Sequence, residues 1–235
     1  MEEILLIDKP KGITSFDVIR RVRKQIGIKK IGHAGTLDPL ATGLMILGVG
    51  PGTKKLTELI KLDKEYSAEI LIGESRTTGD MEGEVIESVT EVKLDPAQIL
   101  VAVSSLVGSV TLPVSAYSAI KKDGIPMYKR ARAAAEIGEK VTDVPVRTMR
   151  VDRATVSNIE VVFADSTMTV ISRVVVTAHF AVGSGTYIRS LAEELGRRLD
   201  YPATLANLRR TKVGLFDLED AKKIEDLVAV VDSRV

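Results

Sequence analysis

The sequence predicts an α+β domain built on a mixed, largely antiparallel sheet with flanking helices. Strand-like and helix-like segments alternate along the chain with no long linker, low-complexity tract or repeat. The gaps between the late strands are as short as hairpin turns, which argues against a purely parallel sheet. A length of 235 residues with 45% apolar residues is enough for a sizeable core.

The first third of the chain predicts two strands around a helix. A short strand over residues 5–7 ends at the Lys-Pro-Lys-Gly run of residues 9–12. A helix over 15–26 follows, with Ser15 as its N-cap, Gly27 as its stop and an apolar stripe formed by Phe16, Ile19, Val22 and Ile26. We then expect a buried strand over 44–49, a helix over 53–60 with Thr53 as N-cap, an alternating strand over 66–72 and a polar loop over 73–83.

The rest of the chain predicts four more helices and several strands. The helices are expected over 96–106, 127–137, 187–199 and 221–231. The strands are expected over 115–120, in two or three segments within 147–178, and over 208–213. Residues 167–180 form the longest strand candidate.

Composition excludes several functional classes. Cysteine is absent and only two histidines occur, so neither a disulfide framework nor a thiolate metal site is possible and a transition-metal centre is disfavoured. No apolar run reaches membrane-spanning length, and the Met-Glu-Glu start is acidic where a secretory signal would be basic. We therefore expect a cytoplasmic protein with no membrane association.

The net charge of +1 conceals a segregation of charge along the chain. Residues 1–60 hold 10 basic against 6 acidic side chains, whereas residues 61–120 hold 4 against 10. Five basic clusters could line one phosphate-binding face: residues 20–24, 29–30, 121–122, 129–132 and 209–212. A solvated helix face explains any single cluster equally well, so the charges favour a nucleic acid partner without requiring one.

Residues 47–55 look like a phosphate-binding loop, because their glycines follow a strand and open a helix. They match neither nucleotide-binding pattern. The Walker sequence needs Lys directly after its last glycine, where this chain has Thr53, and the dinucleotide fingerprint needs a different glycine spacing. A tight connection between strand and helix is therefore the better interpretation than a nucleotide-binding enzyme.

Three other motifs carry candidate chemistry. Residues 32–43 place the carboxylate of Asp38 between apolar neighbours in a glycine-punctuated loop, although an Asx turn would explain an isolated Asp-Pro step. Residues 185–191 deliver Arg189, which could fix a carboxylate by two hydrogen bonds or pair with Glu193 one turn along. Tyr66 is one of few aromatic rings available for stacking, or it is part of the core.

Six sequence blocks, taken in order and spacing, resemble the TruB-type tRNA pseudouridine synthases of bacteria. The blocks span nearly the whole chain and comprise residues 6–15, 32–43, 63–66, 117–121, 185–189 and 208–211. The resemblance implies a pseudouridine synthase fold with a central RNA-binding cleft whose floor holds Asp38. It also implies the conversion of uridine to pseudouridine at position 55 (tRNA numbering) of the T loop, through a flipped-out base.

The resemblance assigns a role to each candidate residue. Asp38 is the catalytic aspartate, which attacks the sugar or base or removes the 2′ proton of the sugar. Arg189 pairs with Asp38 and keeps it ionised, and Tyr66 stacks on the target base. The expected substrate-binding residues are His33, which helps to extrude the nucleotide, and Lys9, Tyr187 and Leu208, which line the pocket.

The resemblance further implies no cofactor and no metal, and tRNA bound through its T arm as the partner. We expect a monomer with no obligate protein partner. The catalytic domain is expected over 1–213, followed by a short helical tail over 214–235 in place of a separate C-terminal RNA-binding domain. Two alternatives remain: an RNA-binding protein that remodels tRNA without using the aspartate, and a synthase that acts on another RNA.

Overall fold

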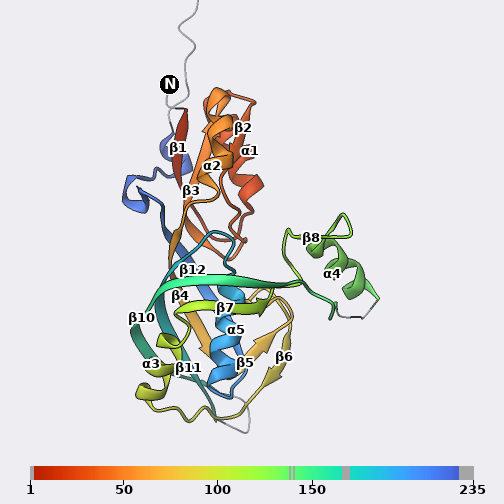
Figure 1. Cartoon of the computed structure of the whole chain (residues 1–235), viewed down its shortest axis with the longest axis vertical. Helices are drawn as coiled ribbons and strands as arrows, with labels where there is room; N and C mark the ends of the chain where they lie inside the picture. The colour runs from red at the N-terminus through yellow and green to blue at the C-terminus, as the bar shows by residue number, and fades with distance from the viewer. Residues whose placement is uncertain (1–2, 138, 140, 166–169, 228–235) are drawn as a thin grey trace, which may run out of the picture. The chain divides into compact units, whose positions relative to one another are not determined.

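The computed structural model describes residues 3–137, 139, 141–165 and 170–227, and Figure 1 labels most of its helices and strands. The chain divides into two compact units. The first contains the residues up to Ser67 and those from Leu208 onward, and the second contains Ala68–Asn207. Strands β4 (Lys64–Ile72) and β12 (Ala203–Val213) continue from one unit into the other, so each unit includes part of both strands.

The first unit is organised around strand β3 (Thr42–Val49), which is buried over almost its whole length. Strands β1 (Ile4–Lys9) and β2 (Ile31–His33) pair with β3 in antiparallel, whereas β12 pairs with it in parallel. The short β13 (Phe216–Asp217) extends β12 as an antiparallel neighbour. Because β3 is covered in this way, its sequence is a continuous apolar run rather than an alternating one. Its core cluster contains Ala34, Leu44, Ile46 and Val213.

Helix α1 (Ser15–Ile26) has the predicted bounds but a different N-cap. Thr14 accepts a hydrogen bond from the Asp17 backbone N–H, and the Asp17 carboxylate accepts one from the Thr14 N–H, which makes a capping box. The predicted Ser15 cap is therefore wrong by one residue. Phe16 is also misplaced, because its side chain is 59% exposed. The buried face is formed by Ser15, Val18, Ile19, Val22 and Ile26, and Gly27 closes the helix at φ 74° as predicted.

The segment after β3 is a 3₁₀ helix over Gly50–Lys55 followed by the short helix α2 (Leu56–Leu59). The predicted helix over 53–60 therefore starts too late, and Thr53 is not its N-cap. A Cβ atom on Gly52 would lie 2.0 Å from the Glu3 carbonyl oxygen, so this glycine lets two backbones meet. The close contact favours the interpretation of residues 47–55 as a tight connection between strand and helix rather than as a phosphate-binding loop.

The second unit is built on a long antiparallel hairpin of β10 (Val146–Asp165) and β11 (Val170–Val182). Its strand order is β12-β4-β11-β10-β7, where β7 is Gly108–Pro113. Helix α3 (Pro96–Ser104) packs against β10, and α5 (Ile188–Arg198) contacts β7 and α3. The remaining elements are α4 (Met127–Glu136) and the hairpins β5 (Glu74–Arg76) with β6 (Val85–Ser88) and β8 (Lys121–Lys122) with β9 (Ile125–Pro126).

The mixed strand directions and flanking helices confirm the predicted α+β class. Three local predictions are wrong. Residues 115–120 form turns rather than a strand, and the strand lies earlier, at β7. The segment 73–83 is not all loop, because it begins with β5. The longest strand is β10 rather than 167–180, and residues 167–169 lie outside the described part of the chain.

The predicted helix over 221–231 is also not found where the structure describes it. Residues 224–226 form a single 3₁₀ turn, Lys222 makes an isolated bridge with Ile7, and residues 228–231 lie outside the described range. Among the described residues, no helix combines the length and the apolar character needed to cross a membrane.

Candidate active site

Asp38 lies in the first unit, on the irregular segment that joins β2 to β3. Its side chain is half-buried, and its neighbours Leu37 and Leu40 are buried at 3% and 5% exposure. The Asp38 carbonyl accepts a hydrogen bond of 3.1 Å from the Ala41 N–H, which closes a turn directly after the carboxylate. The structure thus confirms the partly desolvated loop that the sequence predicts.

The side chains of two buried cations, Lys9 and Arg210, hold this loop through hydrogen bonds to its backbone carbonyls. The Lys9 ammonium group donates to the carbonyl oxygens of Pro39 at 3.2 Å and Ala41 at 2.6 Å. The Arg210 guanidinium donates to the carbonyls of Gly35 at 3.3 Å and Leu44 at 2.7 Å. Lys9 is 0% exposed and Arg210 is 1% exposed. Because buried charges need polar partners, these bonds tie both ends of the loop to strands β1 and β12.

Gly43 explains how β12 can approach the loop so closely. It has φ +100°, and a Cβ atom there would lie 2.3 Å from the carbonyl oxygen of Arg210. Gly43 and Arg210 are direct partners in the parallel β3–β12 pairing. The glycine at the end of the loop is therefore required by backbone geometry.

Arg210 corrects one sequence expectation. The cluster at 209–212 is one of five that could line a phosphate-binding face, but the Arg210 side chain is buried in the first unit. Its neighbour Arg209 makes two hydrogen bonds to the Asp8 carboxylate, at 3.1 and 2.7 Å. These two arginines hold strands together, so charge clustering in the sequence overstated the free basic surface here.

Lys64 is a buried basic residue that the sequence reasoning did not single out. Its ammonium group donates to the carbonyls of Ile60 at 2.7 Å and Leu62 at 2.5 Å, at the end of α2. The pKa of Lys64 is lowered to about 8, mainly by burial. The Arg210 charge also lowers this pKa, whereas the Asp63 charge raises it. The signal available in the sequence was the place of Lys64 two residues before Tyr66, in phase with the alternating strand predicted over 66–72.

His33 ends β2 and is half-buried beside the same loop. Burial lowers its pKa, the Gly35 backbone acts in the opposite direction, and the Arg210 charge lowers it further. The imidazole is therefore neutral at pH 7. Tyr66 on β4 and Leu208 on β12 belong to the same unit and are buried, at 8% and 7% exposure.

Arg189 lies in the first turn of α5, in the second unit, with only 6% of its side chain exposed. It donates to the carbonyl oxygens of Thr78 at 2.9 Å and Tyr117 at 3.2 Å, and the Asp80 carboxylate lies 3.7 Å from its Nη1. This network fixes the guanidinium within its unit. Tyr187, directly before α5, is half-buried.

Asp80 is a second residue that sequence reasoning missed. It is 2% exposed, and its carboxylate accepts hydrogen bonds from the Thr78 hydroxyl at 2.5 Å and the Glu82 N–H at 3.1 Å. Burial raises the pKa of Glu193. The Arg189 charge lowers this pKa, and the Asp80 charge raises it. The contacts of Arg189 thus include Asp80 and two backbone carbonyls, which the sequence interpretation did not consider.

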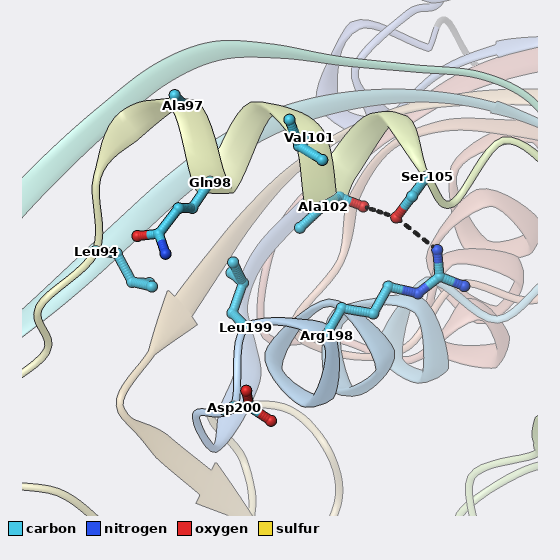
Figure 2. A pocket seen from close by; sticks show the side chains of 9 residues that line it. All are labelled: Leu94, Ala97, Gln98, Val101, Ala102, Ser105, Arg198, Leu199 and Asp200. Carbon is cyan, nitrogen blue, oxygen red and sulfur yellow. Dashed lines mark hydrogen bonds between the residues drawn. The ribbon is translucent and has the colours of Figure 1, made fainter.

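The structure therefore gathers five of the predicted site residues into the first unit: Lys9, His33, Asp38, Tyr66 and Leu208. Tyr187 and Arg189 belong to the second. A cavity of about 550 Å³ lies in the second unit, between α3 and the end of α5, and none of the residues that line it is a predicted site residue (Figure 2). There Arg198 of α5 donates to the hydroxyl of Ser105, the C-cap of α3, so this hydrogen bond joins the two helices; the Ser105 hydroxyl in turn donates to the Ala102 carbonyl within α3.

Comparison with known proteins shows a family relationship over most of the chain. A family model described as TruB family pseudouridylate synthase (N terminal domain) matches residues 23–188. The tRNA pseudouridine synthase B of Corynebacterium efficiens is 42% identical over 231 residues, which cover 95% of this chain and 71% of the relative. The protein of that name from Opitutus terrae is 36% identical over 230 residues, covering 98% of this chain and 88% of the relative.

Solved structures show a similar fold. A chain in the crystal structure of a Cbf5-Nop10-Gar1 complex matches with a TM-score of 0.64 at 24% identity, covering 95% of this chain and 53% of that chain. A chain in the archaeal box H/ACA sRNP Nop10-Cbf5 complex matches with a TM-score of 0.60 at 24% identity, covering 96% and 52%. The present chain thus spans about half the length of these solved chains.

Proposed function

The chain belongs to the TruB family of pseudouridylate synthases, and from this premise we propose that it converts uridine to pseudouridine at position 55 (tRNA numbering) in the T loop of tRNA. The names of its relatives support tRNA as the substrate. The reaction breaks the C1′–N1 bond, forms a C1′–C5 bond, removes the C5 proton and returns a proton to N1. It is an isomerisation, because no atom is gained or lost overall.

The observation that carries this proposal is the clamped loop around Asp38. A half-buried carboxylate between Leu37 and Leu40 is held by a backbone that Lys9 and Arg210 fix on both sides. Such a group is oriented before substrate arrives, which lowers the entropic cost of reaching the reactive geometry. Two chemical roles fit Asp38: attack on the sugar or base as a nucleophile, and removal of the sugar 2′ proton as a general base.

The other site residues have supporting roles in the proposal. Tyr66 stacks on the target base and Leu208 packs against it. Neutral His33 assists the extrusion of the nucleotide from the T loop, which requires unstacking and no charge. Lys9 contributes by orienting Asp38, because its ammonium group is bonded to the carbonyls of Pro39 and Ala41 directly after the aspartate. The pairing of Arg189 with Asp38 remains a prediction of the family resemblance, and the fixed guanidinium supports a role in orientation.

Tritium release tests the reaction and its substrate together. The enzyme is incubated, in EDTA, with an unmodified tRNA transcript that carries 5-tritiated uridine. The proposal predicts release of one tritium per tRNA, and none from a transcript whose T-loop uridine at the target position is replaced by cytidine. Release that persists with the altered transcript would place the target elsewhere. Tight tRNA binding with no release would favour an RNA-remodelling protein.

A further inference from the structure

The segment that opens helix α1 is bonded to the residues on both sides of Asp38. The Ser15 hydroxyl donates to the Leu37 carbonyl at 2.9 Å and accepts from the Leu37 N–H at 2.9 Å. On the other side, the Gly12 N–H donates to the Pro39 carbonyl at 2.8 Å. Residues 12–15 therefore bracket the candidate catalytic aspartate.

Ser15 is not needed for the usual task of a serine at a helix start. The N-cap is Thr14, whose capping box with Asp17 is complete. Ser15 is 3% exposed, and both bonds of its hydroxyl go to a single residue 22 positions away. A hydroxyl that binds both the N–H and the carbonyl of one residue fixes the two peptide planes around it.

We propose that Ser15 is a positioning residue for Asp38. Rotation about the peptide planes of Leu37 would swing the Asp38 Cα and carry its carboxylate away from the reacting atoms. The Ser15 hydroxyl opposes this rotation, and its own position is fixed because Ser15 is the first residue of helix α1. The inference rests on the proposed function, because it assumes that Asp38 is the catalytic carboxylate.

Positioning and simple structural support predict different kinetics. A misplacement of about 1 Å at a catalytic group can cost about 100-fold in rate. Loss of positioning therefore lowers kcat and leaves KM close to the wild-type value, since the substrate is held by other groups. Loss of helix stability alone lowers the melting temperature and leaves both constants unchanged once the protein is folded.

The experiment compares Ser15→Ala with the matched control Thr14→Ala. Thr14→Ala removes the helix cap and should lower Tm by about 2–4 °C while kcat stays within twofold of wild type. Ser15→Ala should lower kcat by about 10- to 100-fold with KM within twofold. In hydrogen exchange, the Leu37 amide should exchange faster in Ser15→Ala than in Thr14→Ala, because it has lost its buried acceptor.

Equal kcat in Ser15→Ala and Thr14→Ala would overturn the proposal, as would a loss confined to KM. If Ser15→Ala does not fold, Ser15→Cys gives the same test, because it fills a similar volume with a weaker donor and acceptor. Its kcat should then fall between those of wild type and the level predicted for alanine. Wild-type protein without turnover would instead overturn the proposed function and this inference with it. An active Asp38→Asn variant would remove Asp38 from the mechanism and overturn this inference, while the proposed conversion of uridine would stand.

Discussion

At the scale of the residue, the site depends on buried cations whose partners are backbone carbonyl oxygens. Lys9, Lys64 and Arg210 are each at most 6% exposed, and each donates to at least two carbonyls of the first unit. Hydrogen bonds from Lys9 and Arg210 to backbone carbonyls hold the loop of residues 35–44, and those from Lys64 hold the turn that follows α2.

The pH dependence of stability follows from Lys64. Its pKa is about 8 in the folded protein, whereas an exposed lysine has a pKa of 10.5. Below pH 8 both the folded and the unfolded state carry the proton, so the contribution of Lys64 is constant there. Between about pH 8 and 10.5 the unfolded chain binds more protons than the folded one, so the free energy of unfolding rises with pH.

The Lys64→Met variant isolates this effect, because methionine has an unbranched side chain of similar shape and cannot titrate. We expect the free energy of unfolding of wild type, measured relative to Lys64→Met by urea denaturation, to increase from about pH 8 to 10.5. Subtracting the variant removes the contribution of the other lysines and tyrosines. A difference that stays flat over this range would show that Lys64 has an ordinary pKa, and a difference that decreases would show that its pKa is raised; either result would contradict the prediction.

At the scale of the element, the first unit depends on how closely β12 can lie against β3. The contact is possible because Gly43 has no side chain and adopts φ +100°. Strand pairing at Arg209–Thr42 and Arg210–Gly43 brings the Arg210 guanidinium under the Asp38 loop. The position of the loop is therefore a consequence of the strand pairing.

Gly43→Ala tests this dependence, with Gly27→Ala as its matched control. Both glycines have a positive φ, but a Cβ atom at Gly43 would meet backbone atoms, whereas one at Gly27 would meet no described atom within 4 Å. Gly27→Ala should cost about 1 kcal/mol of unfolding free energy from the left-handed conformation alone. Gly43→Ala should cost at least about 3 kcal/mol, because strain and steric clash add. Similar costs in chemical denaturation would contradict the close packing of β3 and β12.

The elements that the sequence predicted well are those with a strong local pattern. Helix α1 has a 3.6-residue apolar period and a terminal glycine, and β4 alternates residue by residue. The hairpin of β5 and β6 was missed because all four residues of β6 are exposed, which leaves no apolar alternation to detect. The N-cap error at Ser15 arose because Thr14 and Ser15 are both good caps. The capping box of Thr14 with Asp17 and the tertiary bond of Ser15 to Leu37 distinguish them.

At the scale of the whole molecule, the sequence predicted the family and the candidate catalytic loop, whereas the supporting residues emerged from the fold. Asp80 lies in a polar stretch among other carboxylates, so nothing local marks it as the partner of Arg189. Arg210 lies in a basic run that suggested a surface, and only the strand pairing buries it. Long-range contacts of this kind have no signature in a single sequence.

The family relationship makes the chain a pseudouridylate synthase, and the proposal gives the chemical step to one carboxylate. Chemistry and RNA binding should then be separable, because the phosphate contacts that dominate RNA affinity do not involve Asp38. Asp38→Asn changes one oxygen to nitrogen and keeps the volume of the side chain.

The most direct measurement is single-turnover tritium release by Asp38→Asn beside its dissociation constant for the same unmodified tRNA. We predict that release falls below detection while the dissociation constant stays within a few-fold of the wild-type value at the same salt concentration. Turnover retained in Asp38→Asn, with tRNA bound normally, would remove Asp38 from the mechanism and contradict the central claim.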